Sequence, residues 1–340
     1  MYEKYAVNGT DDDNEGSIDS EFDIEVPLSH CYSIDNAHAR GVVTVSVEPS
    51  GARMVSSSHG DLRIWDFGGF SASNPRPFFE TIPFEGQPIH TQFEQGLLIA
   101  YGSAPTAKVH NRQGDLLTET ARGDMYLYDL RNTKGHISEI TAVSVYDSAH
   151  FFTGSRDNTV RKWAVENAKR GQEALYVCGS RQSQDHVTSL ACDEKVVCGQ
   201  NSGQILLFDK TERPELKLVE DSAVKAMHLI DGQLTCLTKS RISVWDLRNA
   251  KKPIMTTRVI ARDMAQGPDG QLAVVREDEI EILDKSDLQR VAGTPAKEAT
   301  CVAWNGTINQ IVYGCRDGSV KIAFDPKVST KGILIALGKG

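Results

Sequence analysis

The sequence lacks the features that mark a membrane protein or a common enzyme. No apolar run reaches the length of a transmembrane helix, and the N-terminus is acidic, unlike a signal peptide. The motifs GxxxxGKS/T, HExxH and GxSxG are absent. Its 7 cysteines are scattered without a CxxC or other metal-ligand spacing. We therefore expect no catalytic site, cofactor, metal or membrane contact, and a cytosolic or nuclear location.

What the sequence does contain is a recurring pair of short strands joined by a tight turn. In residues 151–164, FFTGSRDNTVRKWA, Asp157 and Asn158 supply the turn and Trp163 closes the second strand. Similar units close at Trp65, His110, Phe208, Trp245, Leu283 and Ala323-Phe324, at steps of 45, 53, 45, 37, 38 and 40 residues. A period of about 40–45 residues is typical of WD40 repeats, each of which forms a four-stranded blade.

This period predicts an all-β fold, a single seven-bladed WD40 β-propeller over residues 27–340. A closed propeller has no unpaired inner edges only if both chain ends share a blade. We assign residues 28–34 to the last blade, beside residues 311–324. The apolar residues 333–337 compete for the same position or add a further outer strand.

The charge is concentrated at the N-terminus. Residues 1–26 hold nine carboxylates against the single cation Lys4, a net charge of −8, whereas the whole chain carries −9. Because this segment has few large apolar residues, it is predicted to be a disordered acidic tail. It either binds a basic partner or keeps the protein soluble.

One blade carries a complete set of residues for a buried hydrogen-bonded chain. A buried Trp needs an acceptor for its N–H, which WD40 repeats supply through a Trp, Ser/Thr, His and Asp series. The candidates are Trp163, Thr153 or Ser155, His136 and Asp157, with a structural role. In the other blades the series is eroded: His59, Ala104 and Lys239 replace the turn Asp in the first, second and fifth blades.

The second blade departs from the repeat in two segments. Residues 68–79 form a Gly-, Ser- and Pro-rich loop with aromatics that look exposed. Residues 123–130 extend the long step of 53 residues. We expect residues 123–130 to form an outer strand; for both segments the alternative is a lid or a partner contact.

Three arginines occupy the position just before the turn Asp: Arg156, Arg276 and Arg316. Together they would form a positive patch suited to an acidic peptide or to RNA phosphates. The alternative is that each pairs with a neighbouring carboxylate, at Asp157, Glu277 or Asp317, and merely solvates the rim.

Several stretches resemble one WD40 family, the gastrulation-defective family, also called WD repeat-containing protein 70. They are residues 49–53, 64–67 with the following Gly-Phe-Ser-Ala-Ser, 107–109, 122–124 with Tyr126 and Asp129, 132–136, 158–161 with Trp163, 165–167, 313–314 and 324–327. The resemblance covers about residues 27–340. The sequence departs from the family in a shortened N-terminal region and worn fifth and sixth blades.

The resemblance implies a nuclear scaffold that is not an enzyme. Members of the family are associated with the spliceosome, beside a G-patch protein and a DEAH-box helicase, and with cullin-4 ubiquitin ligases in the DNA damage response. Docking to a cullin-4 adaptor commonly uses a Trp-Asp-x-Arg sequence, which Trp245, Asp246 and Arg248 supply, with Lys239 replacing the upstream Asp. We expect a monomer within a larger complex, with protein partners and at most indirect RNA contact.

Overall fold

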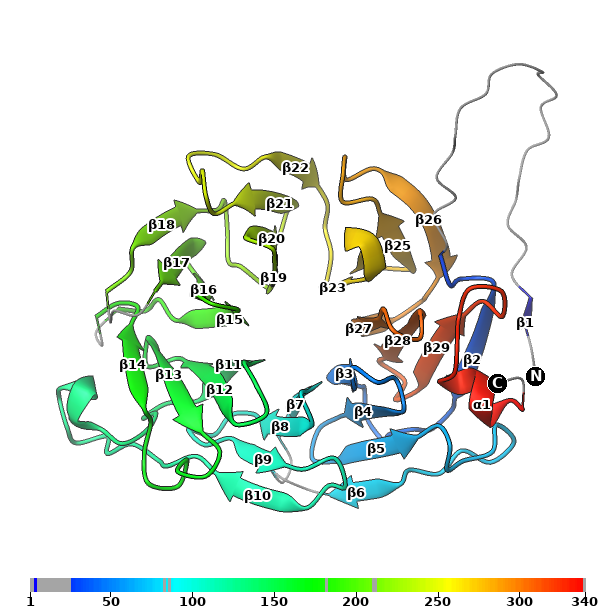
Figure 1. The fold of residues 1–340 in the computed structure, drawn as a ribbon, viewed down its shortest axis with the longest axis horizontal. Helices are drawn as coiled ribbons and strands as arrows, with labels where there is room; N and C mark the ends of the chain where they lie inside the picture. The colour runs from blue at the N-terminus through cyan, green and yellow to red at the C-terminus, as the bar shows by residue number, and fades with distance from the viewer. Residues whose placement is uncertain are drawn as a thin grey trace.

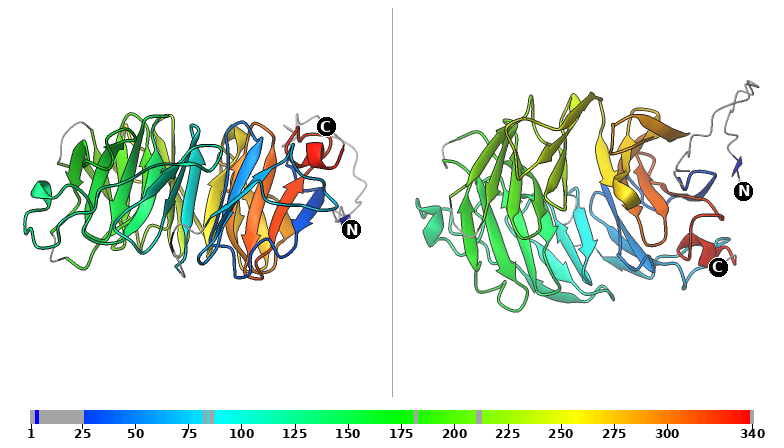
Figure 2. Two further views of the ribbon diagram at one scale, coloured as in Figure 1. Left: turned by 90° about the horizontal axis from the view of Figure 1, so that it is seen from below. Right: turned by 45° about the horizontal axis from the view of Figure 1, so that its top comes forward.

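The computed structural model describes residues 3–4, 26–81, 84, 87–180, 183–209 and 213–338. Apart from the backbone of Glu3–Lys4 and residue 26, the predicted disordered tail lies outside these residues, so its disorder stays a prediction. The described strands form seven sheets around a central axis, which confirms the predicted seven-bladed propeller (Figure 1). Seen from the side, the molecule is a flat disc (Figure 2).

Six blades follow one another along the chain, each with four antiparallel strands, which we call a to d from the axis outward. Blade 1 has β3 (Thr44–Val47), β4 (Arg53–Ser57), β5 (Leu62–Asp66) and β6 (Phe79–Thr81), and blade 2 has β7 (His90–Glu94), β8 (Leu97–Tyr101), β9 (Lys108–His110) and β10 (Leu116–Glu119). Blade 3 has β11 (Ile140–Val145), β12 (His150–Ser155), β13 (Thr159–Ala164) and β14 (Ala174–Val177), and blade 4 has β15 (Val187–Cys192), β16 (Val196–Gln200), β17 (Gln204–Phe208) and β18 (Leu216–Val219). Blade 5 has β19 (Ala226–Ile230), β20 (Gln233–Leu237), β21 (Arg241–Asp246) and β22 (Met255–Arg258), and blade 6 has β23 (Asp263–Gln266), β24 (Leu272–Val275), β25 (Glu279–Leu283) and β26 (Arg290–Pro295).

The seventh blade is built from both ends of the chain. It contains β27 (Ala299–Asn305), β28 (Gln310–Cys315), β29 (Val320–Phe324) and, as its d strand, β2 (His30–Ile34). This pairing confirms the assignment of residues 28–34 to the last blade. The backbone of β1 (Glu3–Lys4) pairs with the outer edge of β2 and makes this sheet five-stranded.

The C-terminal apolar segment is not a strand, so both alternatives for residues 333–337 are wrong. It forms the short helix α1 (Ile333–Ala336), whose buried Ile333 and Leu334 pack in the cluster between blades 7 and 1. The position that it was predicted to contest is filled by β2, and a five-residue apolar run fits a helix as well as a strand.

This helix also explains the loop at residues 68–79. Phe70 is only 8% exposed and packs edge-on against Trp65, with ring centroids 6.3 Å apart. The N–H of Ala72 donates to the carbonyl of Ala336 at 3.3 Å, and the hydroxyl of Tyr32 donates to Ala72 O at 2.7 Å. The expectation of an exposed aromatic loop is thus wrong for Phe70, because the loop packs against the C-terminal helix.

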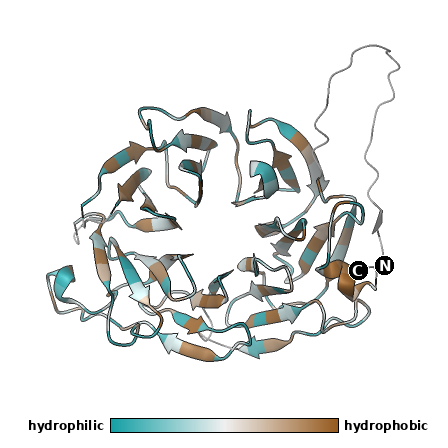
Figure 3. Cartoon of the chain, viewed as in Figure 1, coloured by the Kyte–Doolittle hydropathy of each residue, from teal (hydrophilic) through white to brown (hydrophobic). Residues whose placement is uncertain are grey.

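The buried core lies between neighbouring blades. The cluster between blades 2 and 3, for example, joins Ile99 and Val109 to Phe151 and Trp163. Figure 3 shows apolar residues on strands of every blade and on α1. Among the described residues, no helix is long and apolar enough to cross a bilayer.

Two faces follow from the strand order. The b–c turns and the d-to-a links between blades lie on one side of the disc, which we call the b–c face. The a–b and c–d turns lie on the opposite side, the a–b face. Each candidate residue can therefore be assigned to a face from its place in its blade.

Candidate functional site

The four tetrad residues predicted in blade 3 lie together in the structure. Trp163 Nε1 donates to Thr153 Oγ1 at 2.7 Å, and the same hydroxyl lies 2.7 Å from Nε2 of His136. His136 Nδ1 lies 3.0 Å from Oδ2 of Asp157. All four side chains are buried. Ser155, the alternative to Thr153, instead donates to the carbonyl of Ser138 at 3.1 Å.

The direction of each hydrogen bond follows from the chemistry of the groups. The indole N–H can only donate, so the Thr153 oxygen accepts it and the hydroxyl hydrogen points to His136 Nε2. Nδ1 then carries the imidazole proton and donates it to Asp157. Burial raises the pKa of the Asp157 carboxyl, but His136 and the hydroxyl of Thr159 outweigh it and lower this pKa to about 2. The series therefore ends on a stable carboxylate, as expected of a structural role.

Blade 1 contains a second complete tetrad, so the prediction that only blade 3 has one is wrong. Trp65 Nε1 donates to Ser56 Oγ at 2.8 Å, and Ser56 Oγ lies 2.7 Å from His38 Nε2. His38 Nδ1 lies 2.8 Å from Asp61 Oδ2. His59 misled the prediction because the b–c turn of this blade brings its Asp two residues closer to the Trp than in blade 3.

Blade 5 satisfies its Trp in another way. The carboxylate of Glu220, buried at the start of the preceding link, accepts from Trp245 Nε1 at 2.6 Å and from Ser243 Oγ at 3.2 Å. Arg241 Nη2 lies 2.6 Å from the same carboxylate. One buried glutamate thus replaces the hydroxyl that accepts from Trp in the tetrads. Lys239, at the position of the missing turn Asp, is exposed.

The tetrapeptide at the end of blade 5 presents one side chain to solvent. Trp245 is 5% exposed, and Asp246 Oδ1 accepts from the backbone N–H of Arg248 at 2.9 Å. Arg248 is exposed on the c–d turn, where its Nη2 donates to the carbonyl of Asp231 at 3.3 Å. Arg248 therefore lies on the a–b face, the face opposite to the three rim arginines.

Arg156, Arg276 and Arg316 all lie on b–c turns, and two of them are in ion pairs. Arg156 pairs with Glu139, and Arg276 Nη1 lies 3.0 Å from Oε2 of Glu281. Arg316 is exposed and forms no ion pair with any described residue.

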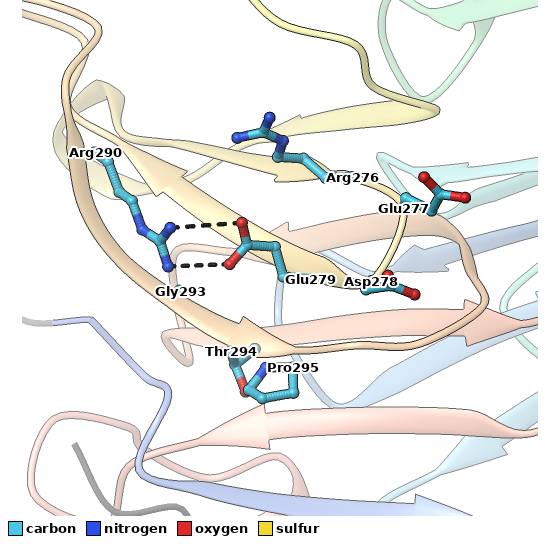
Figure 4. Close-up of a pocket in the computed structure, with 8 residues that line it drawn as sticks. All are labelled: Arg276, Glu277, Asp278, Glu279, Arg290, Gly293, Thr294 and Pro295. Atoms are coloured by element: carbon cyan, nitrogen blue, oxygen red, sulfur yellow. Dashed lines mark hydrogen bonds and ion pairs between the residues drawn. The ribbon is translucent and has the colours of Figure 1, made fainter. Parts of the chain in front are cut away.

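The carboxylates that pair with Arg156 and Arg276 are not the neighbouring ones that were predicted. Asp157 accepts a hydrogen bond from His136, and Asp317 Oδ1 accepts from the N–H and the hydroxyl of Ser319 at 2.8 and 2.6 Å. Figure 4 shows Arg276 turned away from Glu277 at the margin of a cavity of about 500 Å³. In the same cavity, Arg290 Nη2 lies 3.0 Å from Glu279 Oε2, so charges of both signs line it.

A polar cavity of about 400 Å³ occupies the central channel at the b–c side, and Lys225, Arg262 and Asp263 line it. Asp263 accepts from the N–H groups of Met264 and Val302, both at 2.9 Å. Burial raises the pKa of this carboxyl to about 6, against these hydrogen bonds and Lys225, which lower it. In the described part of the chain, no group of three or more His, Cys, Asp or Glu could hold a metal ion.

Residues 123–130 do not form the expected outer strand. The d strand of blade 2 is β10, and residues 120–139 form the link to blade 3, with the 3-10 helix η1 (Leu130–Asn132) within it. Asp124 Oδ1 accepts from the N–H of Tyr126 at 2.9 Å, and Asp129 Oδ1 accepts from that of Arg131 at 3.0 Å. These two local turns prevent an extended conformation.

A fully buried arginine anchors this link, and it was not among the predicted site residues. Arg161 of β13 donates to Thr133 Oγ1 at 2.8 Å and to the carbonyls of Thr133 and Leu130, both at 3.2 Å. Gln172 Nε2 adds a hydrogen bond to Thr133 O at 2.8 Å. Two of the stretches that carry the family resemblance, residues 132–136 and 158–161, are therefore one structural unit. Only contacts across 28 residues could have revealed it.

Comparisons with known proteins agree with this architecture. The WD domain, G-beta repeat family matches residues 29–66 and 128–164. WD repeat-containing protein 70 of Mus musculus is 28% identical over 96% of this chain, and that of Bos taurus is 26% identical over 93%. The gastrulation defective protein 1 homolog of Drosophila melanogaster is 26% identical over 92%. The matched region spans 53–54% of the length of these three relatives.

The relatives carry the name of the family that the sequence motifs suggested, and the resemblance is confirmed. The polar clusters described above join the strands of a blade to the links that enter it. The chain is thus a seven-bladed WD40 propeller similar to WD repeat-containing protein 70 and to the gastrulation defective protein 1 homolog.

Proposed function

We propose that this chain is a non-catalytic scaffold in the nucleus, associated with the spliceosome in pre-mRNA splicing. The observation that carries the proposal is the unit formed by residues 132–136 and 158–161. There a buried Arg161 fixes a long exposed link, and the sequence of this unit resembles the gastrulation-defective family. A shared surface feature bears on function more directly than shared blade residues, which serve the fold.

The partners that the family resemblance implies are a DEAH-box helicase and a G-patch protein. A propeller suits such a role because its rim and two faces can hold several proteins at once. Contact with RNA would be indirect or confined to the b–c face, where Arg316 is exposed outside any ion pair with the described residues.

Affinity purification from nuclear extract tests this proposal. The tagged chain should enrich late spliceosome components, including a DEAH-box helicase, over a tagged propeller from an unrelated protein. A tagged chain that stays outside the nucleus, or a purification without splicing proteins, would contradict the proposal.

The second candidate is docking to a cullin-4 adaptor in the DNA damage response. The observation that favours it is the exposure of Arg248 at the end of blade 5, where Glu220 holds Trp245 in place and Asp246 accepts from the N–H of Arg248. One exposed cation can anchor a small protein contact. Arg248→Ala should then abolish adaptor binding, whereas Lys251→Ala, an exposed cation in the same turn, should leave it unchanged. Equal binding by both variants would show that Arg248 does not contact the adaptor. No binding by the unmodified chain would contradict docking to a cullin-4 adaptor altogether.

A further inference from the structure

The link between blades 2 and 3 exposes four consecutive large apolar side chains. Met125, Tyr126, Leu127 and Tyr128 are 55%, 91%, 39% and 75% exposed. We call residues 125–128 the apolar loop. Scattered single apolar residues are normal on a protein surface, but a contiguous run costs solubility and marks a site that another molecule covers. Figures 1 and 2 show this link projecting from the rim beside β14.

The base of the apolar loop is fixed by the interior of the propeller. Arg161 binds the backbone of Leu130 and Thr133, and the N–H of Gly123 donates to the carbonyl of His136 at 2.8 Å. The link covers residues 120–139, more than twice the length of any other d-to-a link in the structure. Such an anchored loop loses little conformational entropy when a partner binds, which favours affinity.

The apolar loop lies next to an open sheet edge. A cavity of about 390 Å³ separates Tyr128, Leu130 and their neighbours from Val177 and Gly179, at the end of the outer strand β14. The N–H of Cys178 donates to Asn158 O, so alternate residues of β14 face β13 and the backbone groups of Leu175 and Val177 face outward. In the described sheet, β14 pairs only with β13.

The outer strand of blade 7 pairs with an additional strand. There β1 adds to β2 as a fifth strand, with Glu3 opposite Cys31 and Lys4 opposite His30. The outer edge of a blade in this protein therefore accommodates an additional extended segment. A helical partner could not use the outward N–H and C=O groups of β14, whereas a strand can.

We propose that an extended peptide segment of a partner protein, with large apolar side chains at alternate positions, adds to β14 as a fifth strand of blade 3. Its alternate side chains would pack between the apolar loop and the end of β14. Around the loop, Asp124 and Asp129 stand against Arg122, Arg131 and Lys134, a net charge of only +1, so apolar contact rather than charge selects the partner. The proposal rests on the scaffold role and does not depend on the choice between splicing and ubiquitylation.

A display library of random linear peptides, panned on the whole chain, tests the proposal. The enriched peptides should carry apolar residues at every second position and should bind Tyr126→Ser/Tyr128→Ser at least about tenfold more weakly. Val177→Pro should have the same effect, because it removes an outward N–H that no other described strand uses. The matched controls, Val219→Pro at the corresponding residue of β18 and Ile260→Ser at a distant exposed side chain, should bind normally.

Hydrogen exchange with an enriched peptide bound provides the second measurement. The amides of Leu175 and Val177 should gain protection, while the denaturation midpoints of the variants confirm that they are folded. Peptides with a helical period, binding that is equal in all variants, or protection elsewhere would overturn the proposal. Self-association that Val177→Pro abolishes would overturn it in favour of a second copy of the chain. None of these results bears on the nuclear purification, so the two proposals can fail separately.

Discussion

Replacing Thr153 with Val isolates the contribution of the blade 3 tetrad to stability. The two side chains have almost the same shape, so the change leaves the packing of β12 intact and removes only the hydroxyl. That hydroxyl serves two buried partners, as the acceptor for Trp163 Nε1 and the donor to His136 Nε2, each at 2.7 Å. Trp163 Nε1 and His136 Nε2 each lose this hydrogen bond, and neither atom can reach water because both side chains are fully buried.

The magnitude follows from the cost of stranding buried polar groups. Each buried group left without a partner costs about 1–3 kcal/mol, so the two groups stranded by Thr153→Val should lower the free energy of unfolding by about 2–6 kcal/mol. Thr235 in β20 offers a matched control, because it is also fully buried but its hydroxyl has no hydrogen-bond partner among the described residues. Thr235→Val removes an unsatisfied hydroxyl, so it should be neutral or stabilising by about 1 kcal/mol.

Urea denaturation of both variants measures this difference. A shift of the midpoint at unchanged slope reports stability alone. Ser56→Ala in blade 1 should repeat the loss, and its effect should add to that of Thr153→Val because the two tetrads share no partner. Equal midpoints for Thr153→Val and Thr235→Val would refute the reasoning.

Three further predictions concern Asp263, the N-terminal tail and the rim arginines. The raised pKa of Asp263, about 6, contributes stability that is fully present below pH about 4 and is lost as the pH rises through about 6. Urea titrations should therefore show that the free energy of unfolding of Asp263→Asn rises by about 2 kcal/mol relative to that of the unmodified chain between pH 4 and pH 7. A difference that does not depend on pH would contradict this. Deleting residues 1–26 should leave unfolding cooperative by calorimetry, because it removes β1 but no strand inside the ring; a broadened transition would show a structural role. Replacing Arg156, Arg276 and Arg316 with Glu should weaken RNA association at low salt and weaken it less at high salt. Arg316→Glu alone should give most of the effect, because the other two arginines are in ion pairs. RNA binding that is unchanged across the salt range would exclude the positive patch.

The repeat made the architecture predictable from the sequence. A strand pair every 40–45 residues requires a blade, and seven of them with matched ends require closure, which correctly assigned residues 28–34 to blade 7. The blade 3 residues His136, Asp157 and Trp163 could be named because their spacing is close to the ideal repeat. The shorter turn of blade 1 concealed an equivalent tetrad ending at Asp61.

The departures from the repeat were the segments that sequence reasoning misjudged. Residues 333–337 are a short apolar run whose period does not distinguish a strand from a helix. Residues 123–130 have strand-like aromatics, but Asp124 and Asp129 bend the backbone through their own side chains. In both segments tertiary contacts or local turns decided the conformation, and neither leaves a periodic signal.

Two arginines at equivalent positions of blades 1 and 3 differ in burial and in the length of the link that they bind. Arg63 and Arg161 both stand two residues before the Trp of their tetrad, and each binds the link that enters its blade. Arg63 donates to the carbonyl of Ala37 in the link of residues 35–43, and its side chain stays 22% exposed. Arg161 is fully buried, because the longer link of residues 120–139 covers it and is held by three of its hydrogen bonds. The arginine stands at this position only in the two blades that have complete tetrads, and in blade 3 the longer link turns the same anchor into the support of an exposed apolar surface.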